Sequence, residues 1–209
     1  MKEYKLPIGC DVPETIILAD GDFPSHPLAL EWLRQCPYVV CCDGAANTYI
    51  RSGRMPEAIV GDGDSLLPDI KERYASLIHS EAEQETNDLS KAFRFCLSQE
   101  RRRITIMGAT GKREDHTIGN VSLLADYMEQ AEVSMMTDYG IFVPIREDSM
   151  FESYIGQQIS VFNMNSTALS AEGLAYPLSV FTNWWQGTLN EALARHFIIR
   201  TIHIKNRNL

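Results

Sequence analysis

Short apolar runs that alternate with helical patterns constrain the fold of this chain more than any other feature. Five runs occur before residue 145, each bounded by Gly, Pro or charged residues, as buried parallel strands are. They are Thr15–Ala19, Tyr38–Cys42, Ala58–Val60, Ile104–Met107 and Val133–Met136. Strands that alternate with helices form doubly wound sheets, so we predict an N-terminal doubly wound parallel α/β domain.

Helical patterns lie between these runs. Residues 45–52 end at Gly53 with Pro56 beyond it, which is a pattern typical of a helix end. Residues 88–97 and 118–128 repeat apolar residues at intervals of three and four, as amphipathic helices do. The stripes are Leu89, Ala92, Phe93 and Cys96 in the first and Ile118, Val121, Ala125 and Met128 in the second.

The pattern changes near residue 145, after which no long amphipathic helix is evident. The remaining segments read as short strands separated by Asn, Ser, Gly and Pro. They are Gln158–Met164, Gly173–Pro177, Ser179–Thr182 and His196–Lys205. We therefore predict an α/β domain over residues 1–145, followed by a small C-terminal β-sandwich over residues 146–209.

Composition excludes several classes of function. The 209 residues carry a net charge of −9, which argues against nucleic-acid binding. No apolar run approaches the ~20 residues of a membrane span, and the N-terminus lacks the apolar core of a signal peptide, so we expect a cytoplasmic protein. The five cysteines form no C-x-x-C pair, which indicates neither a zinc site nor a disulfide framework. With this charge, a polyphosphate ligand would need a divalent metal.

Two carboxylates follow the third apolar run in the segment IVGDGDSL. Asp62 and Asp64 are two residues apart and point the same way in an extended backbone, while Gly61 and Gly63 keep bulk away from them. Like charges so placed favour a bound cation, and hard carboxylate oxygens suit Mg²⁺. The alternative is a surface turn, in which Asp and Gly are simply good turn formers.

Three further acids fall at strand ends or helix starts, which share one edge of such a sheet. Asp43 begins the segment DGAAN, and Asp88 and Asp115 each open a predicted helix. Each has a simpler explanation, as a turn residue or as a first-turn acid favoured by the helix dipole. Their number on one edge favours a joint metal and phosphate site.

The segment Gly108–Arg113 supplies the positive charge that the acids lack. Its two glycines allow backbone N–H groups to approach an anion, and Lys112 and Arg113 precede a helix N-terminus. It is not a Walker P-loop, because two residues rather than four separate Gly108 from Gly111. Lys91 lies three residues after Asp88 on one helix face and is either a phosphate ligand or a solvated lysine.

Taken in order, several of these segments resemble the thiamine pyrophosphokinase family. The matching motifs are DGAAN (43–47), GDGDS (61–65), QETND-x-x-KA (84–92), GATGKREDHTIGN (108–120), GLAYPL (173–178) and GTLNE (187–191). Each motif is weak alone, but the ordered set covers nearly the whole chain. The resemblance implies transfer of a pyrophosphoryl group from ATP to thiamine, with Mg²⁺ as cofactor, in a homodimer whose sites form between subunits.

The resemblance also implies roles for single residues. Asp62, Asp64 and Asp88 are expected to hold Mg²⁺, and with Asp115 they form the expected catalytic set. The expected nucleotide- and phosphate-binding residues are Asp43, Asn47, Ser65, Lys91, Gly108, Gly111 and Arg113. The expected thiamine-binding residues are Tyr176, Thr188 and Asn190. Trp184 and Trp185 are either an aromatic platform for thiamine or part of the sandwich core or dimer interface.

The chain departs from the family pattern at four positions. Gly63 stands where the family usually has an apolar residue, and Asn87 replaces the common Thr before Asp88. Leu189 stands where Ser is usual, and Ala171 where Thr is common. These changes keep two other functions open: a thiamine- or nucleotide-binding protein without catalysis, and a metal-dependent nucleotide-sugar transferase that uses a D-x-D motif.

Overall fold

The structure, a computed structural model, describes residues 1–7, 11–81, 83, 85–164, 168–178 and 187–202, and it divides the chain into two units. Ile8–Pro144 forms the α/β unit, whereas Met1–Pro7 joins Ile145–Leu209 in the β unit. The expected assignment of residues 1–145 to one domain thus does not describe the N-terminus. Lys2–Tyr4 form strand β1, which is too short to show a periodic pattern in the sequence.

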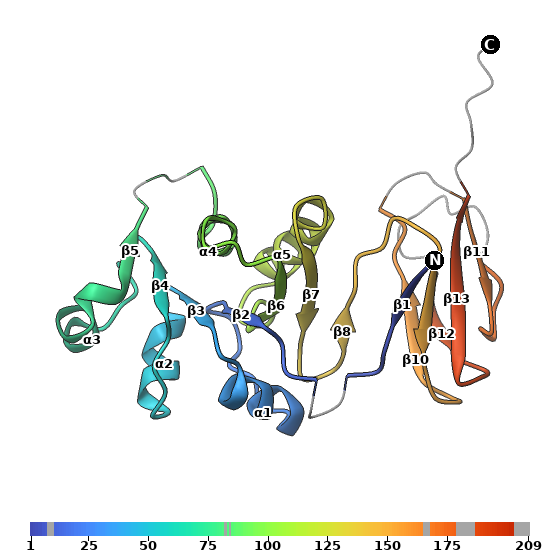
Figure 1. Cartoon of the computed structure of the whole chain (residues 1–209), viewed down its shortest axis with the longest axis horizontal. Coiled ribbons are helices and arrows are strands. Elements are labelled where there is room, and N and C mark those ends of the chain that lie inside the picture. Colours follow the sequence, from blue (N-terminus) through green and yellow to red (C-terminus); the bar gives the residue numbers. More distant parts are fainter. Residues whose placement is uncertain (8–10, 82, 84, 165–167, 179–186, 203–209) are drawn as a thin grey trace, which may run out of the picture. The chain divides into compact units, whose positions relative to one another are not determined.

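The α/β unit is built on one seven-stranded sheet in the order β5-β4-β3-β2-β6-β7-β8 (Figure 1). Its strands are β2 (Thr15–Leu18), β3 (Val39–Cys42), β4 (Ala58–Gly61), β5 (Ile78–Ser80), β6 (Arg103–Met107), β7 (Glu132–Met136) and β8 (Ile141–Phe142). Every neighbouring pair is parallel except β7 with β8, which is antiparallel. The predicted parallel sheet is confirmed, and the two strands missing from the prediction, β5 and β8, are short.

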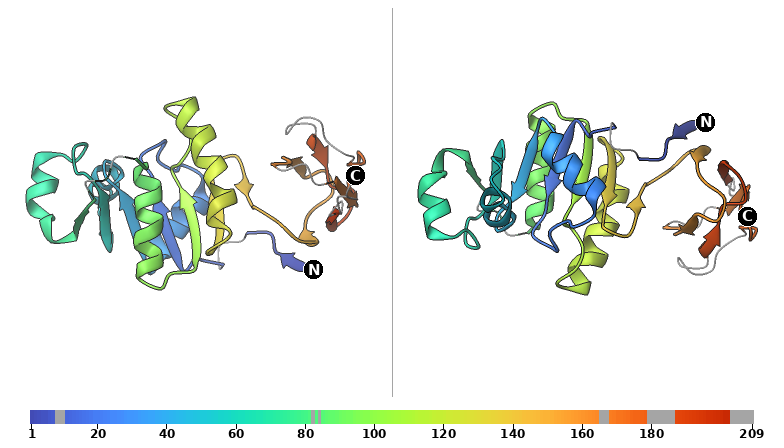
Figure 2. Two further views of the ribbon diagram at one scale, coloured as in Figure 1. Left: turned by 90° about the horizontal axis from the view of Figure 1, so that it is seen from above. Right: turned by 90° about the horizontal axis from the view of Figure 1, so that it is seen from below.

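Helices cover both faces of this sheet, as the views in Figure 2 show. They are α1 (Pro27–Gln35), α2 (Ala45–Arg51), α3 (Pro68–Arg73), the 3₁₀ turn η1 (Ala75–Leu77), α4 (Asp88–Ser98) and α5 (Glu114–Tyr127). Side chains alternate along each strand, so Ile16 and Leu18 pack with α1, α2 and α3, while Ile17 packs with α4 and α5. The prediction of a doubly wound domain is confirmed.

The buried face of α5 differs from the predicted stripe. Ile118 is 64% exposed, whereas Asn120, Leu124 and Tyr127 are buried. The apolar spacing was misleading because an asparagine occupies a core-facing position. Such a residue reads as polar surface in a sequence, but it is stable in a core when its amide is fully hydrogen-bonded.

Helices α4 and α5 are locked together by aromatic packing. Phe93 stacks on Tyr127 with ring centroids 4.0 Å apart, and the Tyr127 hydroxyl lies 2.8 Å from Oγ of Ser90. Burial raises the pKa of Tyr127 to about 12, so this hydroxyl stays neutral and able to donate. The contact fixes the start of α4, which carries Asp88, against the helix that follows Gly108–Arg113.

The β unit consists of a four-stranded sheet in the order β1-β9-β13-β11 and a two-stranded sheet of β10 and β12. Its strands after β1 are β9 (Ser149–Glu152), β10 (Gln158–Val161), β11 (Ala168–Glu172), β12 (Gly187–Glu191) and β13 (His196–Ile202). The predicted β-rich C-terminal domain is confirmed. Gly173–Pro177 is not a strand but makes one bridge between Leu174 and Ala192, and the predicted strand Ser179–Thr182 lies outside the described residues.

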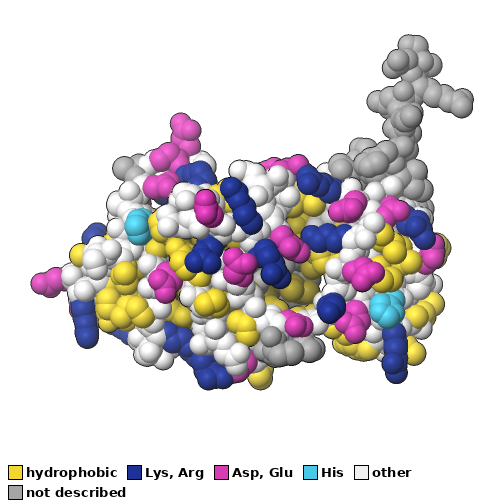
Figure 3. Space-filling view, in the orientation of Figure 1, with side chains coloured by type: hydrophobic (Ala, Val, Ile, Leu, Met, Phe, Trp, Pro, Cys, Tyr) yellow, Lys and Arg dark blue, Asp and Glu magenta, His cyan; other side chains and the backbone are white. Residues whose placement is uncertain are grey.

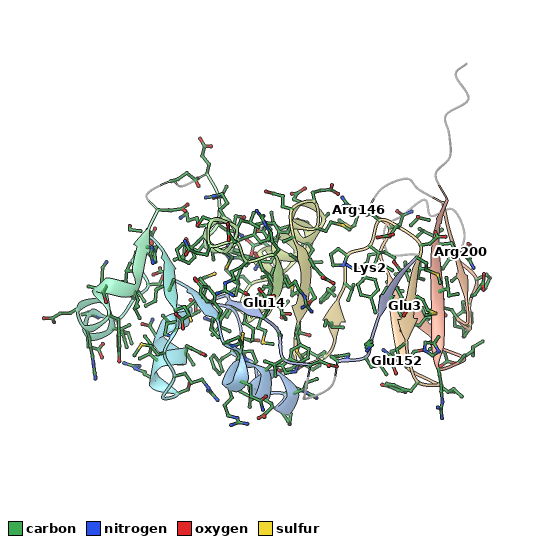
Figure 4. The ribbon with its side chains drawn as sticks, viewed as in Figure 1. Lys2, Glu3, Glu14, Arg146, Glu152 and Arg200 are labelled. Atoms are coloured by element: carbon green, nitrogen blue, oxygen red, sulfur yellow. The ribbon has the colours of Figure 1, made fainter. Side chains whose placement is uncertain are left out.

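Aromatic side chains anchor the N-terminal strand in the β unit. Tyr4, Phe151 and Phe197 stack in succession across β1, β9 and β13, with centroids 4.7 and 4.9 Å apart. Glu152 of β9 lies at the end of β1 (Figure 4), where its Oε2 accepts a hydrogen bond from the backbone N–H of Leu6 at 3.1 Å. Cross-strand aromatic pairs of this kind stabilise sheets, so they explain why the first residues belong to this unit.

Charged side chains of both signs are interspersed on the face shown in Figure 3 rather than gathered by sign. Among the described residues, no helix has both the length and the apolar character needed to cross a membrane.

Candidate functional site

The carboxyl ends of the parallel strands gather the predicted polar segments at one edge of the sheet. Segment 43–47 follows β3, segment 61–65 follows β4, segment 85–88 follows β5, and segment 108–116 follows β6. β2 lies between β3 and β6, and the connections from these strands run to opposite faces. Ligands of open α/β sheets bind outside the strand ends at such a point.

Three carboxylates meet at this edge. Oxygen atoms of Asp43, Asp62 and Asp64 all lie within 4.8 Å of one another, and we call these residues the acidic triad. Backbone donors hold the triad in place, since Ser65 N–H donates to Oδ2 of Asp43 at 3.0 Å and Asp64 N–H donates to Oδ1 of Asp62 at 3.1 Å. The arrangement matches the hard oxygen ligands that divalent cations prefer.

Gly63 has a structural role in the turn that follows β4. Its φ of 76° lies in the left-handed region, which an apolar side chain would resist. This conformation folds the backbone back on Asp62, and Nζ of Lys71 donates to the Gly63 carbonyl at 2.8 Å. The glycine thus shapes the tight turn that presents Asp62 and Asp64.

Asp43 is the member of the triad whose environment is most unusual. It is only 3% exposed, and its Oδ1 is buried with no hydrogen-bond partner in the described part of the chain. Burial above all, and then the neighbouring acids, raise its pKa to about 6. Hydrogen bonding, first from Ser65, lowers the pKa of Asp64 instead. A buried carboxylate oxygen that faces two other carboxylates fits a divalent cation.

Asp88 lies beside the triad, and its role as a metal ligand stays a prediction. A Cβ built on Gly61 would lie 2.8 Å from Cβ of Asp43 and 3.4 Å from Cγ of Asp88, so these two acids flank Gly61. Oδ1 of Asp88 accepts a hydrogen bond from Nζ of Lys91 at 3.0 Å. Asp43 lies close enough to join Asp62 and Asp64 because β3 and β4 are neighbours in the sheet.

Lys91 is buried, at 4% exposure, so the alternative of a solvated lysine is wrong. Burial alone would lower its pKa, but the hydrogen bond and the charge of Asp88 outweigh burial, and the pKa of Lys91 is raised. The amine is therefore a fixed positive charge next to the acidic triad.

The loop Gly108–Arg113 is held by the segment that follows β2. Gly21 N–H donates to the carbonyl of Gly108, and Asp22 N–H donates to that of Thr110 at 2.8 Å. Gly111 has a φ of 78°, and a Cβ built on it would clash with the Asp22 carboxylate. Gly111 therefore makes room for the Asp22 side chain within the protein, a role that the sequence reasoning did not foresee.

The basic residues of this loop are paired with acids. Nζ of Lys112 donates to the carbonyl oxygen and to Oδ1 of Asp20 at 2.9 and 3.1 Å. Arg113 pairs with Asp115 at 2.6 Å, and both side chains are largely exposed. The hydrogen bond from Arg113 is the main cause that lowers the pKa of Asp115. A phosphate ligand would therefore have to compete with Asp115 for the Arg113 guanidinium.

A pocket of about 170 Å³ next to the triad was missed by sequence reasoning. Its lining is Ala19, Asp20, Gly21, Asp22, Phe23, Ala45, Thr48 and Lys112. Gly44 separates the two sites, because a Cβ built on it would lie 2.7 Å from Oδ2 of Asp20 and 3.1 Å from Cβ of Ser65. The signal was available in the sequence, since Asp20-Gly21-Asp22 follows a strand in the same pattern as Asp62–Asp64.

Asn47 acts as a link between α2 and the triad loop. Its Nδ2 donates to the carbonyl of Ser65 at 2.8 Å, and its Oδ1 accepts from Leu67 N–H at 3.0 Å. Both ends of the amide are thus engaged, which positions the backbone after Asp64.

The predicted thiamine residues lie in the β unit. Asn190 is 2% exposed and clamps the backbone of Tyr176, since its Oδ1 accepts from the Tyr176 N–H at 3.0 Å and its Nδ2 donates to the Tyr176 carbonyl at 2.8 Å. Tyr176 itself is 62% exposed and Thr188 is half-buried. The structure therefore brings Asn190 and Tyr176 together. Trp184 and Trp185 lie outside the described residues.

Replacing Leu189 with Gly should raise the free energy of unfolding by about 1 kcal/mol. Leu189 has a φ of 61° and an 81% exposed side chain, so glycine removes strain and little packing. The matched control is Leu193→Gly, because Leu193 is 54% exposed without a positive φ and should lose stability. Chemical denaturation of both variants measures the difference, and equal losses would contradict a strained Leu189.

Comparison with known proteins agrees with this architecture. The family model "Thiamin pyrophosphokinase, catalytic domain" matches residues 29–136, and "Thiamin pyrophosphokinase, substrate-binding domain" matches residues 140–203. The chain belongs to the thiamin pyrophosphokinase family. All six segments that carry the resemblance in the sequence fall within these two matches.

Individual thiamine pyrophosphokinases are similar over part of their length. Thiamine pyrophosphokinase 1 of Oryza sativa subsp. japonica is 30% identical over 129 residues, which is 50% of this chain and 49% of the relative. The Bacillus subtilis protein is 34% identical over 86 residues, which is 39% of this chain and 40% of the relative. The chain spans about half the length, or less, of the curated relatives it matches.

Solved structures show the same fold at low identity. The thiamin pyrophosphokinase of Candida albicans superposes with a TM-score of 0.75 at 19% identity, covering 96% of this chain and 89% of the other. The yeast crystal structure gives a TM-score of 0.76 at 17% identity, covering 96% and 88%.

Proposed function

We propose that this protein transfers a pyrophosphoryl group from ATP to the hydroxyl of thiamine, giving thiamine diphosphate and AMP. The observation that carries the proposal is the acidic triad Asp43, Asp62 and Asp64 at the sheet edge of a member of this family. Phosphoryl-type transfer depends mostly on positioning the reactants and on neutralising the phosphate charge. This edge of the sheet supplies the acids that could hold a metal ion, the buried Lys91 and the basic residues of the loop Gly108–Arg113.

The triad would hold Mg²⁺, which would neutralise phosphate charge and orient the donor when bound. The orphaned Oδ1 of Asp43 supports this assignment. The buried Lys91 would contact the phosphate chain from the α4 side, and Arg113 would do so from the loop before α5, exchanging Asp115 for phosphate. The pocket beside Gly44 would take the nucleoside, because Gly44 lies between Asp20 of the pocket and Ser65 of the triad loop.

In the β unit, Tyr176 and Thr188 would contact thiamine, while Asn190 would hold Tyr176 through its backbone. Either Asp64 or Asp115 would accept the proton of the thiamine hydroxyl. The family resemblance further suggests a cytoplasmic homodimer with sites formed between subunits. Sedimentation analysis tests whether the protein is a dimer.

The test is an incubation of the purified protein with Mg²⁺, thiamine and ATP labelled at the α-phosphate. Equal amounts of labelled AMP and of thiamine diphosphate are expected. Labelled ADP as the sole nucleotide product would contradict pyrophosphoryl transfer, and binding of both substrates without any product would instead favour the alternative of a silent binding protein.

Mg²⁺ should raise the melting temperature more at pH 8 than at pH 5. The pKa of Asp43 is raised to about 6, so the folded state holds more protons than the unfolded state and loses stability as pH rises from about 4 to about 6. A cation that binds the ionised triad reverses this loss only above that window. Thermal melts with NaCl at matched ionic strength provide the control, and equal shifts at both pH values would rule out Asp43 as a ligand.

A further inference from the structure

A chain of side-chain amides connects the start of α4 with the loop before α5. Asn87, the N-cap of α4, donates from Nδ2 to Oδ1 of Asn120 at 3.0 Å. Asn120 donates in turn from Nδ2 to the carbonyl oxygen of Ala109 at 2.8 Å. Asn120 is 8% exposed on the core face of α5, where a helix of this kind usually buries an apolar residue.

The direction of this chain is fixed at both of its ends. The backbone N–H of Ser90 can only donate, so it requires the oxygen of Asn87, and the two atoms lie 3.0 Å apart. The carbonyl of Ala109 can only accept, so it requires the amide nitrogen of Asn120. With both amides oriented in this way, the central bond between Asn87 and Asn120 has one possible polarity.

The two ends of the chain adjoin different parts of the phosphate site. Asn87 directly precedes Asp88 and lies four residues before the buried Lys91. Ala109 lies within the loop Gly108–Arg113 and four residues before Arg113. The two amides therefore connect the segment that carries Lys91 with the loop that carries Arg113.

We propose that Asn120 is a positioning residue, which acts through Asn87 and Ala109 to hold the Gly108–Arg113 loop in register with Asp88 and Lys91. The proposal rests on the proposed function for its effect on turnover, because both cations must meet one phosphate chain there. Small misplacements of reacting groups lower rates strongly, by about a hundredfold per ångström in sensitive cases.

Two variants separate the links of the chain. Asn87→Ser retains an oxygen that caps α4 but is too short to reach Asn120, and Asn87 is exposed, so the variant should fold. Asn120→Ala removes both bonds of the second amide. Ser122→Ala is the matched control, because in the described part of the chain the Ser122 hydroxyl bonds within α5, to the carbonyl of Gly119.

Each variant is expected to lower kcat by about tenfold with little change in the KM for thiamine. Because both variants break the same chain of hydrogen bonds, the kcat of the double variant should be no lower than that of the less active single variant. Ser122→Ala should match the wild type. A merely structural role would lower the melting temperature and leave the kcat of the folded enzyme intact. Additive losses in the double variant would overturn the proposal.

Amide hydrogen exchange tests the same link without turnover. Asn87→Ser should speed exchange of the amides in residues 108–113, although position 87 is about twenty residues away along the chain. Unchanged exchange in that loop would overturn the proposal even if the enzyme is active. Faster exchange in a protein that forms no thiamine diphosphate would support the link and reject the proposed function alone.

Discussion

Asp43→Asn is expected to reduce turnover about a hundred- to a thousandfold while it stabilises the protein in the absence of divalent cations. Asparagine removes the charge of the buried member of the triad, so a bound cation loses a ligand. Its side chain can still accept the hydrogen bond from Ser65 N–H, and its amide can donate to the neighbouring carboxylate of Asp64.

The stabilisation follows from the pKa of Asp43. A rise from 3.8 to about 6 means that folding disfavours the ionised carboxylate by roughly 3 kcal/mol at pH 8, and Asn escapes this cost. At pH 4 Asp43 is protonated in the folded state, so the variant and the wild type should there have similar stability. The gain should therefore grow as pH rises from about 4 to about 6 and then stay constant.

Asp62→Asn provides the matched comparison, because Asp62 belongs to the same triad but is exposed. It should lose activity to a similar extent without becoming more stable. Kinetics with saturating Mg²⁺ and chemical denaturation with a chelator measure the two properties separately. An active Asp43→Asn protein would remove Asp43 from the cation site, and a less stable one would contradict its unfavourable burial.

Local sequence patterns predicted the secondary-structure elements whose formation depends mainly on nearby residues. Buried parallel strands must be continuous apolar runs, so all five predicted strands of the α/β unit are present. Helix α1 was missed although Pro27 stands at its start, because its N-cap position holds His26, which is not one of the common capping residues. Strands β11 and β12 carry no clear alternation and depend on their partners.

In the candidate site too, local patterns predicted single residues but not their contacts in the folded chain. Asp43, Asp62 and Asp64 were identified because each follows a strand, and strand ends share an edge. Which acids converge depends on strand order, which the sequence does not state, and so the contact of Asp43 with Asp62 and Asp64 was not foreseen. Asp88 was expected as a metal ligand from the family resemblance, and that role stays a prediction. The clamp between Asn190 and Tyr176 joins residues fourteen positions apart, and no spacing rule predicts such contacts.

Lys91→Met is expected to lower turnover by about a hundredfold or more, because it removes the buried cation nearest to the triad. Methionine fills the space of the lysine stem, so packing is preserved. The lost charge leaves Asp88 without its partner, and because that carboxylate is 35% exposed the cost in stability should be about 2 kcal/mol rather than the larger loss of a fully buried pair.

The double variant Lys91→Met with Asp88→Asn separates the two effects of this lysine. It removes the unpaired carboxylate, so the stability lost in Lys91→Met should largely return, while turnover should stay low. Arg94→Met is the control for loss of a cation from α4, since Arg94 pairs with the partly exposed Glu81 and the exposed Glu83 and should change stability by less than about 1 kcal/mol. Recovered turnover in the double variant would assign Lys91 a purely structural part, because the reaction would then proceed without the charge of either Lys91 or Asp88.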